Sequence, residues 1–177
     1  VSALVWLPAQ GAQFFGHGGG LALLQARGLF LAVAESLTGG ALASQIVSVP
    51  GASNVFLGSI TAYQSSIKNN LLAVPADLLQ IHGAVSAESA EAMAAGVRDN
   101  FAKAAGLGVD RVVGIATTGV AGPDADGDKP VGLVYLGFSL PGRGESSIEL
   151  HLTGDRSEIR AAAVQSALSE LGEQIAD

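Results

Sequence analysis

The order of apolar and polar positions along the chain predicts alternating strands and helices. Apolar, β-compatible runs occur in residues 29–34, 55–63, 111–116, 131–140 and 146–152. Apolar residues recur at helical spacing in residues 21–27, 41–49, 64–72, 75–83, 86–104 and 155–175. Strands and helices alternate early, whereas two strands follow one another late. We therefore expect the α/β class, as a three-layer α/β/α domain with a mixed, mostly parallel sheet.

Polar residues suited to capping stand at the start of the two longest predicted helices. Ser86 occupies the expected N-cap of one helix, where its hydroxyl can accept a hydrogen bond from a free backbone N–H group. Asp155 occupies the same position in the last helix, and Glu158 follows at the reciprocal position of a capping box. These residues predict where both helices begin.

The first twenty residues follow neither pattern. Glycines surround His17, and no strand precedes them. We expect residues 1–20 to form an irregular N-terminal segment. Residues 21–177 are then expected to form one domain, since they show no internal repeat and no sign of a second domain.

Composition limits the classes of function. The chain has 177 residues, of which 49% are hydrophobic, enough for one sizeable core. It carries 9 Lys+Arg against 16 Asp+Glu, a formal net charge of -7, so it lacks the basic face that nucleic-acid binding requires. A small anionic ligand stays compatible with this balance. The absence of cysteine excludes disulfides, thiol nucleophiles and thiolate metal sites.

Apolar content also bears on location and assembly. No apolar run reaches the roughly 18–20 residues that span a bilayer, and the first residues lack the basic start of a signal peptide. We expect a cytoplasmic protein without a membrane partner. The mean hydropathy of +0.42 and the 14% of charged residues predict more apolar surface than a monomer hides, and hence a homodimer.

The most informative stretch is residues 29–40, where an apolar strand leads through a polar turn into a helix. The turn places Ser36 and Thr38 at a helix N-terminus. Free backbone N–H groups and the helix dipole favour negative charge there. Such a turn can hold a phosphate, stabilise an oxyanion or simply cap the helix.

Two more polar turns follow predicted strands, in residues 63–68 and 117–123. Ligands of open α/β sheets collect at the carboxyl ends of strands, so the three turns can border one pocket. The glycine-rich loop 117–123 lets the backbone approach a ligand closely, but it also fits an ordinary turn. Lys68, one of three lysines, stands near a strand end. It is a general base for a serine if burial keeps it neutral, and otherwise a solvated surface lysine.

Several other motifs fail on their spacing. Residues 65–68 match S-x-x-K, but the companion S-D-N and K-T-G motifs are absent. Residues 122–129 lack the Ser/Thr that follows the lysine of a phosphate loop. Asp124, Asp126 and Asp128 alternate like calcium ligands without the bidentate acid. The three histidines lie far apart. We therefore expect no metal site.

Six motifs occur together in one order. They are AESLTGG (34–40), GSITAY with a following lysine (58–68), HGAVS (82–86), TGVAGPD (118–124), KPVG (129–132) and GDR (154–156). In this combination the chain resembles the CinA C-terminal domain family, the nicotinamide mononucleotide deamidases, from about residue 21 onward. The resemblance implies an amidohydrolase without metal or cofactor. Its small-molecule substrate would be nicotinamide mononucleotide, hydrolysed to nicotinate mononucleotide and ammonia in pyridine nucleotide salvage.

The resemblance also assigns roles to residues. Ser36 is then the nucleophile and Lys68 its base, and Tyr63 orients this dyad or stacks near the pyridine ring. Backbone N–H groups near residues 38–40 or at Gly119 would stabilise the oxyanion, and Glu35 either pairs with the lysine or supports the turn. The full set of expected substrate- and phosphate-binding residues is Glu35, Thr38, Gly39, Gly40, Thr118, Gly119, Ala121, Gly122, Arg156 and Arg160.

Two other functions compete with this one. The first is a catalytically silent nucleotide-binding or protein-interaction domain, linked to competence or DNA damage through the names attached to the family. The second is hydrolysis of a related nucleotide amide by the same dyad. The presence of both Ser36 and Lys68 favours an enzyme, because a binding domain needs no base beside its hydroxyl. The polar loop 122–132 departs from the more glycine-rich loop of the family, so its tip is expected to differ.

Overall fold

The computed structural model describes residues 19–176. The expected irregular segment therefore lies largely outside the described residues. Its last two residues, Gly19 and Gly20, belong instead to the first turn of helix α2 (Gly19–Ala26), which corrects their assignment.

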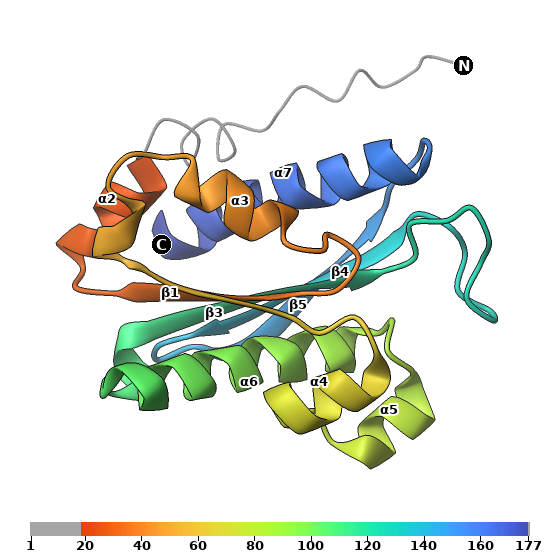
Figure 1. The fold of residues 1–177 in the computed structure, drawn as a ribbon, viewed down its shortest axis with the longest axis horizontal. Coiled ribbons are helices and arrows are strands. Elements are labelled where there is room, and N and C mark those ends of the chain that lie inside the picture. The colour runs from red at the N-terminus through yellow and green to blue at the C-terminus, as the bar shows by residue number, and fades with distance from the viewer. Residues whose placement is uncertain (1–18, 177) are drawn as a thin grey trace.

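Within the described residues, five strands form one sheet in the order β2-β1-β3-β4-β5 (Figure 1). They are β1 (Phe30–Glu35), β2 (Phe56–Thr61), β3 (Val112–Gly119), β4 (Leu133–Leu140) and β5 (Gly144–His151). β1 pairs in parallel with β2 and β3, whereas β4 pairs antiparallel with β3 and β5. The sheet is mixed, as predicted. By strand direction the sheet is mostly parallel, because among the described strands only β4 runs opposite to the others. By pairing it is half parallel, with two parallel and two antiparallel pairs of neighbouring strands. The antiparallel pairs arise because β4 follows β3, and β5 follows β4, without a crossover helix.

Helices cover both faces of the sheet, which confirms the three-layer prediction (Figure 1). One face carries α2, α3 (Ala41–Val47) and α7 (Arg156–Ala176). The other carries α4 (Ser65–Leu72), α5 (Ala76–His82) and α6 (Ala87–Ala105). The short 3-10 turns η1 (Ala52–Asn54) and η2 (Val109–Arg111) precede β2 and β3. None of the helices described combines the length and the apolar character that crossing a membrane requires.

The central strand β1 supplies two cores by alternation. Leu31 and Val33 enter the core under α2, α3 and α7, whereas Ala32 and Ala34 enter the core under α6. β3 divides its side chains in the same way. A strand covered on both faces has no polar side, which explains why these two segments are almost continuously apolar in sequence.

Side-chain caps start the two long helices at the predicted positions. The Ser86 hydroxyl accepts a hydrogen bond of 3.1 Å from the Ser89 N–H at the start of α6. The Asp155 carboxylate accepts from the N–H groups of Ser157 and Glu158, at 2.8 and 2.9 Å, and the Glu158 carboxylate accepts from the Asp155 N–H at 2.8 Å. The capping box that the sequence predicts is therefore formed at α7.

Glycine allows α6 to approach the sheet closely. A Cβ added at Gly114 of β3 would overlap the carbonyl of Ala94, and one added at Gly137 of β4 would overlap the carbonyl of Ala90. Both carbonyls belong to the backbone of α6, which cannot move aside as a flexible side chain would. Close packing at these two points fixes the height of α6 above the sheet.

We predict that Gly114→Ala and Gly137→Ala each lower the free energy of unfolding by about 2–3 kcal/mol, the usual cost of overpacking. Urea denaturation measures this change. Gly127→Ala is the control, because its Cβ would meet nothing within 4 Å and only its φ of +59° opposes the substitution. That strain costs about 1 kcal/mol. Equal losses in all three variants would contradict the close approach.

Candidate active site

A cavity of about 180 Å³ lies at the carboxyl ends of the parallel strands. Its walls come from segments that are far apart in the sequence: the turn after β1, the start of α4, the segment before α6, the end of β3 and the first turn of α7. The lining residues are Ser36, Leu37, Tyr63, Lys68, Ala84, Val85, Thr118, Gly119, Ala121, Asp126 and Arg156. All three polar turns picked out in the sequence therefore border one cavity.

Ser36 and Lys68 form the polar centre of this cavity. Lys68 Nζ lies 2.8 Å from Ser36 Oγ, and the exposed fractions of the two residues are 1% for the lysine and 8% for the serine. Burial lowers the pKa of Lys68 from 10.5 to about 8, because desolvation penalises the charged ammonium. The interpretation of Lys68 as a solvated surface lysine is therefore wrong.

Helix α4 presents Lys68, as the helix predicted over residues 64–72 requires, so the lysine itself does not lie at the end of the strand. The strand end supplies the partner instead: the carbonyl of Ala62, directly after β2, accepts a hydrogen bond of 2.6 Å from Lys68 Nζ. The N–H of Ala62 in turn donates to the carbonyl of Glu35 at 2.8 Å. The pairing of β1 and β2 thus continues into the site and fixes the acceptor that orients the lysine.

The Glu35 carboxylate closes the N-terminus of α3. It is fully buried and accepts hydrogen bonds from the N–H groups of Gly40, Leu42 and Ala43, at 2.9, 3.1 and 2.9 Å. Of its two expected roles, Glu35 takes the support of the turn, and Lys68 has no carboxylate partner among residues 19–176. Because a paired carboxylate would raise the pKa of the lysine, this arrangement favours its neutral form.

The two glycines of the turn have no N–H group left for a ligand. The N–H of Gly39 donates to the carbonyl of Ser36 at 3.1 Å, and the N–H of Gly40 donates to the carboxylate described above. This corrects the expectation that they stabilise an oxyanion. The N–H groups of Leu37 and Thr38, by contrast, have no acceptor in the described part of the chain.

Arg160 holds the turn from the side of α7. Its Nε donates to the carbonyl of Leu37 and its Nη2 to the carbonyl of Thr38, both at 2.9 Å, and it is not among the residues that line the cavity. Arg160 therefore contacts the turn rather than the cavity, while its expected place beside a substrate phosphate stays a prediction. A trans peptide is planar, so fixing the Leu37 carbonyl also fixes the Thr38 N–H, which points away from the guanidinium.

Two threonine hydroxyls tie the turn and the loop to their surroundings. The hydroxyl of Thr38 lies 2.8 Å from that of Thr117 in β3, and both side chains are fully buried. Thr38 therefore supports the turn rather than lining the cavity, contrary to expectation. The hydroxyl of Thr118 donates to the carbonyl of Ala84 at 2.6 Å and joins β3 to the segment before α6.

Arg156 and Tyr63 stand together in the cavity wall. Arg156 Nη2 donates to the Tyr63 hydroxyl at 3.0 Å, and its Nη1 donates to the carbonyl of Gly122. Gly122 thus contacts the arginine instead of lining the cavity. Tyr63 is 59% exposed, and its recorded hydrogen bond within residues 19–176 goes to Arg156 rather than to the dyad. Of the two arginines of α7, Arg156 is therefore the one that lines the cavity.

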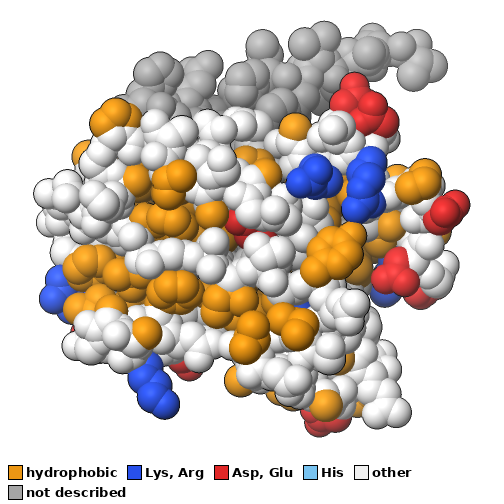
Figure 2. All heavy atoms as spheres, in the orientation of Figure 1, with side chains coloured by type: hydrophobic (Ala, Val, Ile, Leu, Met, Phe, Trp, Pro, Cys, Tyr) orange, Lys and Arg blue, Asp and Glu red, His pale blue; other side chains and the backbone are white. Residues whose placement is uncertain are grey.

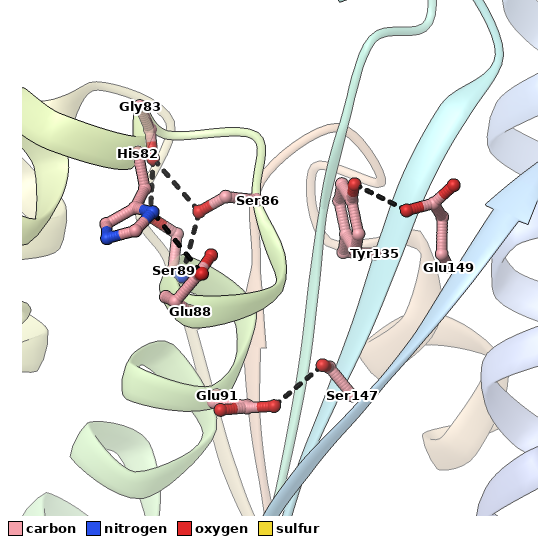
Figure 3. A network of polar contacts seen from close by, with 9 residues as sticks. All are labelled: His82, Gly83, Ser86, Glu88, Ser89, Glu91, Tyr135, Ser147 and Glu149. Atoms are coloured by element: carbon pink, nitrogen blue, oxygen red, sulfur yellow. Dashed lines mark hydrogen bonds and ion pairs between the residues drawn. The ribbon is translucent and has the colours of Figure 1, made fainter.

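A polar network fixes the wall in front of α6 (Figure 3). The carbonyl of Gly83 accepts from the hydroxyls of Ser86 and Ser89, at 3.3 and 2.7 Å, and His82 Nδ1 lies 3.3 Å from a carboxylate oxygen of Glu88. Among the residues described, no group of three or more His, Asp and Glu side chains is placed to hold a metal ion.

Sequence reasoning missed four residues that line the cavity: Leu37, Ala84, Val85 and Asp126. The motif HGAVS contains two of them and was the available signal, but apolar side chains in a motif carry no chemistry of their own. Asp126 drew attention only through a calcium-like spacing, and nothing in the sequence showed that its loop folds over the cavity.

Comparison with known proteins places the chain in one family. The family model for the CinA C-terminal domain matches residues 20–175. A CinA-like protein from Frankia casuarinae is 47% identical over 148 residues, 84% of this chain and 32% of that protein. A putative competence-damage inducible protein from Desulforamulus reducens is 43% identical over 141 residues, 80% of this chain and 32% of that protein. The chain thus spans about a third of the length of these curated relatives.

Solved structures share the fold. A competence-damaged protein (CinA) superfamily protein from Klebsiella pneumoniae is 29% identical, with a TM-score of 0.81 over 94% of this chain and 98% of that one. One from Escherichia coli is 28% identical, with a TM-score of 0.80 over 96% of this chain and 94% of that one. The mixed five-stranded sheet between helices is therefore the arrangement of that superfamily.

The lowered pKa of Lys68 predicts how stability depends on pH. The pKa is about 8 in the folded chain against 10.5 when solvated, so the unfolded chain binds more protons between these values and stability rises with pH there. We expect the free energy of unfolding of the parent, minus that of Lys68→Met, to rise by about 3 kcal/mol from pH 8 to pH 10.5. Urea denaturation across this range measures it.

The control is Lys103→Met, the same change at an exposed lysine. The difference between the parent and this variant is expected to stay flat over the same range. A flat difference for Lys68→Met as well would show that the buried lysine titrates normally.

Proposed function

The chain belongs to the CinA C-terminal domain family, and we propose that it is a metal-independent amidohydrolase that converts nicotinamide mononucleotide to nicotinate mononucleotide and ammonia. The observation that carries the proposal is the buried contact of 2.8 Å between Lys68 Nζ and Ser36 Oγ. Burying a lysine costs stability. A domain that only binds a nucleotide gains nothing from a base beside its hydroxyl, whereas a hydrolase requires one.

The first step activates the serine. The Ala62 carbonyl accepts one N–H of neutral Lys68 and leaves the nitrogen lone pair for the proton of Ser36. The Ser36 Oγ then attacks the carboxamide carbon while Lys68 takes its proton. With a pKa of about 8, about a tenth of Lys68 is neutral at pH 7, which is enough for general-base catalysis near neutral pH.

The tetrahedral intermediate needs donors for its oxyanion. The N–H groups of Leu37 and Thr38 are suited to this role, since they follow the nucleophile directly and have no acceptor within the described residues. One such donor contributes about 3–4 kcal/mol to the transition state. Protonated Lys68 then gives its proton to the departing nitrogen, which leaves as ammonia, and the acyl group stays on Ser36 as an ester. Water, deprotonated by Lys68, hydrolyses this ester and releases nicotinate mononucleotide.

The charges in the cavity suit this substrate. Nicotinamide mononucleotide combines an anionic phosphate with a cationic pyridinium ring. Arg156 offers a guanidinium for the phosphate, and the ring of Tyr63, exposed at the cavity, offers a face for the pyridine. Asp126 adds a carboxylate to the same lining and favours the positive ring.

We predict ammonia release from nicotinamide mononucleotide by the purified chain in the presence of EDTA. Ser36→Ala and Lys68→Met are each expected to lose at least about 1,000-fold in kcat, because they remove the nucleophile and its base. Ser66→Ala and Lys103→Met change exposed residues of the same types and are expected to keep the parent activity. A folded parent that binds the nucleotide without releasing ammonia would refute the enzyme.

We further predict that the two arginines of α7 affect different kinetic constants. Arg156→Met is expected to raise KM for nicotinamide mononucleotide about tenfold or more and to leave KM for nicotinamide riboside, which lacks the phosphate, unchanged. Arg160→Met is expected to lower kcat about tenfold or more for both substrates, because it releases the turn that holds the oxyanion donors. Steady-state kinetics on both substrates separates the roles, and a phosphate-dependent effect of Arg160→Met would return it to substrate binding.

A further inference from the structure

The segments after β1 that build the dyad carry no charge besides that of Lys68. It is the one charged residue between Glu35 and Asp77, a stretch that forms the turn after β1, α3, β2 and α4. Its amine is buried, with the hydroxyl of Ser36 and the carbonyl of Ala62 as hydrogen-bond partners. Neither bulk water nor a carboxylate of the described residues stabilises its protonated form. The protonation of this amine is therefore sensitive to any charge that a ligand brings beside it.

The charged groups on the other elements around the site are engaged elsewhere or lie at the exposed rim of the cavity. Glu35 of β1 is held by N–H groups at the start of α3. Tyr63 after β2, Asp126 in the loop between β3 and β4 and Arg156 of α7 line the cavity with exposed side chains, and no charged residue of α5 or α6 is among the described lining residues.

Figure 2 shows basic and acidic side chains together at the end of the molecule where α7 begins and the loop between β3 and β4 projects. Water and salt screen charges at such a rim. This agrees with desolvation as the cause that lowers the pKa of Lys68, and it leaves the neighbourhood of the amine open to the charge of a bound ligand.

The proposed reaction brings a positive charge of the substrate beside this amine. Attack requires the carboxamide carbon at about 3–3.5 Å from Ser36 Oγ, and Lys68 Nζ lies 2.8 Å from the same oxygen. In nicotinamide mononucleotide a single ring carbon separates the ring atom that bears the carboxamide from the positive nitrogen. The ring charge thus comes to roughly 5–8 Å from Nζ, a distance at which two charges in a poorly solvated site still repel strongly. The phosphate lies at the other end of the nucleotide, the end that Arg156 is proposed to bind.

We propose that the positive charge of the substrate completes the activation of Lys68, so that the site selects cationic amides over neutral amides of the same shape. This inference rests on the proposed amidohydrolase function. A pyridinium ring with its carboxamide at Ser36 repels the proton of the lysine, which passes to water. The neutral amine then takes the proton of the Ser36 hydroxyl as that oxygen attacks the carboxamide carbon. An amide on a neutral ring leaves most of the base protonated, and Lys68 thereby determines specificity as well as acting as the base.

Titration of the amine by NMR tests this inference without turnover. The chain contains three lysines, Lys68, Lys103 and Lys129, so isotopic labelling of lysine at Cε gives three signals, of which Lys68→Met removes one. In Ser36→Ala, which lacks the nucleophile, saturating nicotinamide mononucleotide is expected to lower the pKa of Lys68 and to raise its acid dissociation constant at least about tenfold.

The matched ligand is the phosphate ester of benzamide riboside, which has the same shape and phosphate but a neutral ring. It is expected to raise the dissociation constant of Lys68 less than about threefold, through desolvation alone. The signal of exposed Lys103 serves as the internal control and is expected to titrate alike with both ligands. Equal effects of the two ligands on Lys68, or no effect of either, would overturn the inference.

The pH profiles of turnover supply the second measurement. The profile of kcat/KM reports the base in the free enzyme, and that of kcat reports the base in the complex with substrate. For nicotinamide mononucleotide, the acid limb of kcat is expected to lie about one pH unit or more below that of kcat/KM. Asp126→Asn removes the carboxylate at the rim and is expected to keep this separation. Turnover with coincident profiles would overturn the inference and leave the proposed function standing, whereas binding without ammonia release would refute the function itself.

Discussion

The burial of one amino group is the constraint on which the site depends. Lys68 Nζ sits in the interior with the carbonyl of Ala62 and the hydroxyl of Ser36 as its partners, and desolvation alone lowers its pKa. That effect survives only if no carboxylate approaches the amine. Glu35 is next to Ser36 in sequence, yet the N-terminus of α3 engages both of its oxygens. The helix N-terminus that orders the turn thus also holds the carboxylate away from Lys68, where its negative charge would favour the protonated form of the lysine.

The sequence predicted the fold almost element by element, because periodicity and capping are local. Each strand and helix in the description has a counterpart in the expected order, and the caps at Ser86 and Asp155 are formed by the hydrogen bonds that their residue types imply. What local patterning does not reach is how elements far apart in the sequence are arranged against one another. The share of parallel pairings depends on which strands become neighbours, and hydrophobic patterning does not contain that information. The close approach of α6, which rests on Gly114 and Gly137, is invisible to it for the same reason.

The site was less predictable, because its roles depend on which way each group points. From residue types and motif order, Ser36, Lys68, Tyr63 and Arg156 were expected to belong to one site, and all four line the same cavity. Residue types and motif order did not show that Arg160 grips two carbonyls of the turn, or that the glycines of AESLTGG use their N–H groups internally. Such roles follow from peptide-plane orientation and from competition between acceptors, which only three-dimensional coordinates resolve. An arginine one helical turn from another looks equivalent in sequence and acts on a different partner.

The scarcity of charge in residues 36–76 accords with the same constraint. Between Glu35 and Asp77 the sequence holds one charged residue, Lys68, and this stretch includes both the turn after β1 and helix α4, which bring Ser36 and Lys68 together. A carboxylate in contact with the amine would favour its protonated form, and none of the residues described forms such a pair with it. The segments that build the dyad thus supply its hydroxyl and its carbonyl acceptor without adding a negative charge of their own.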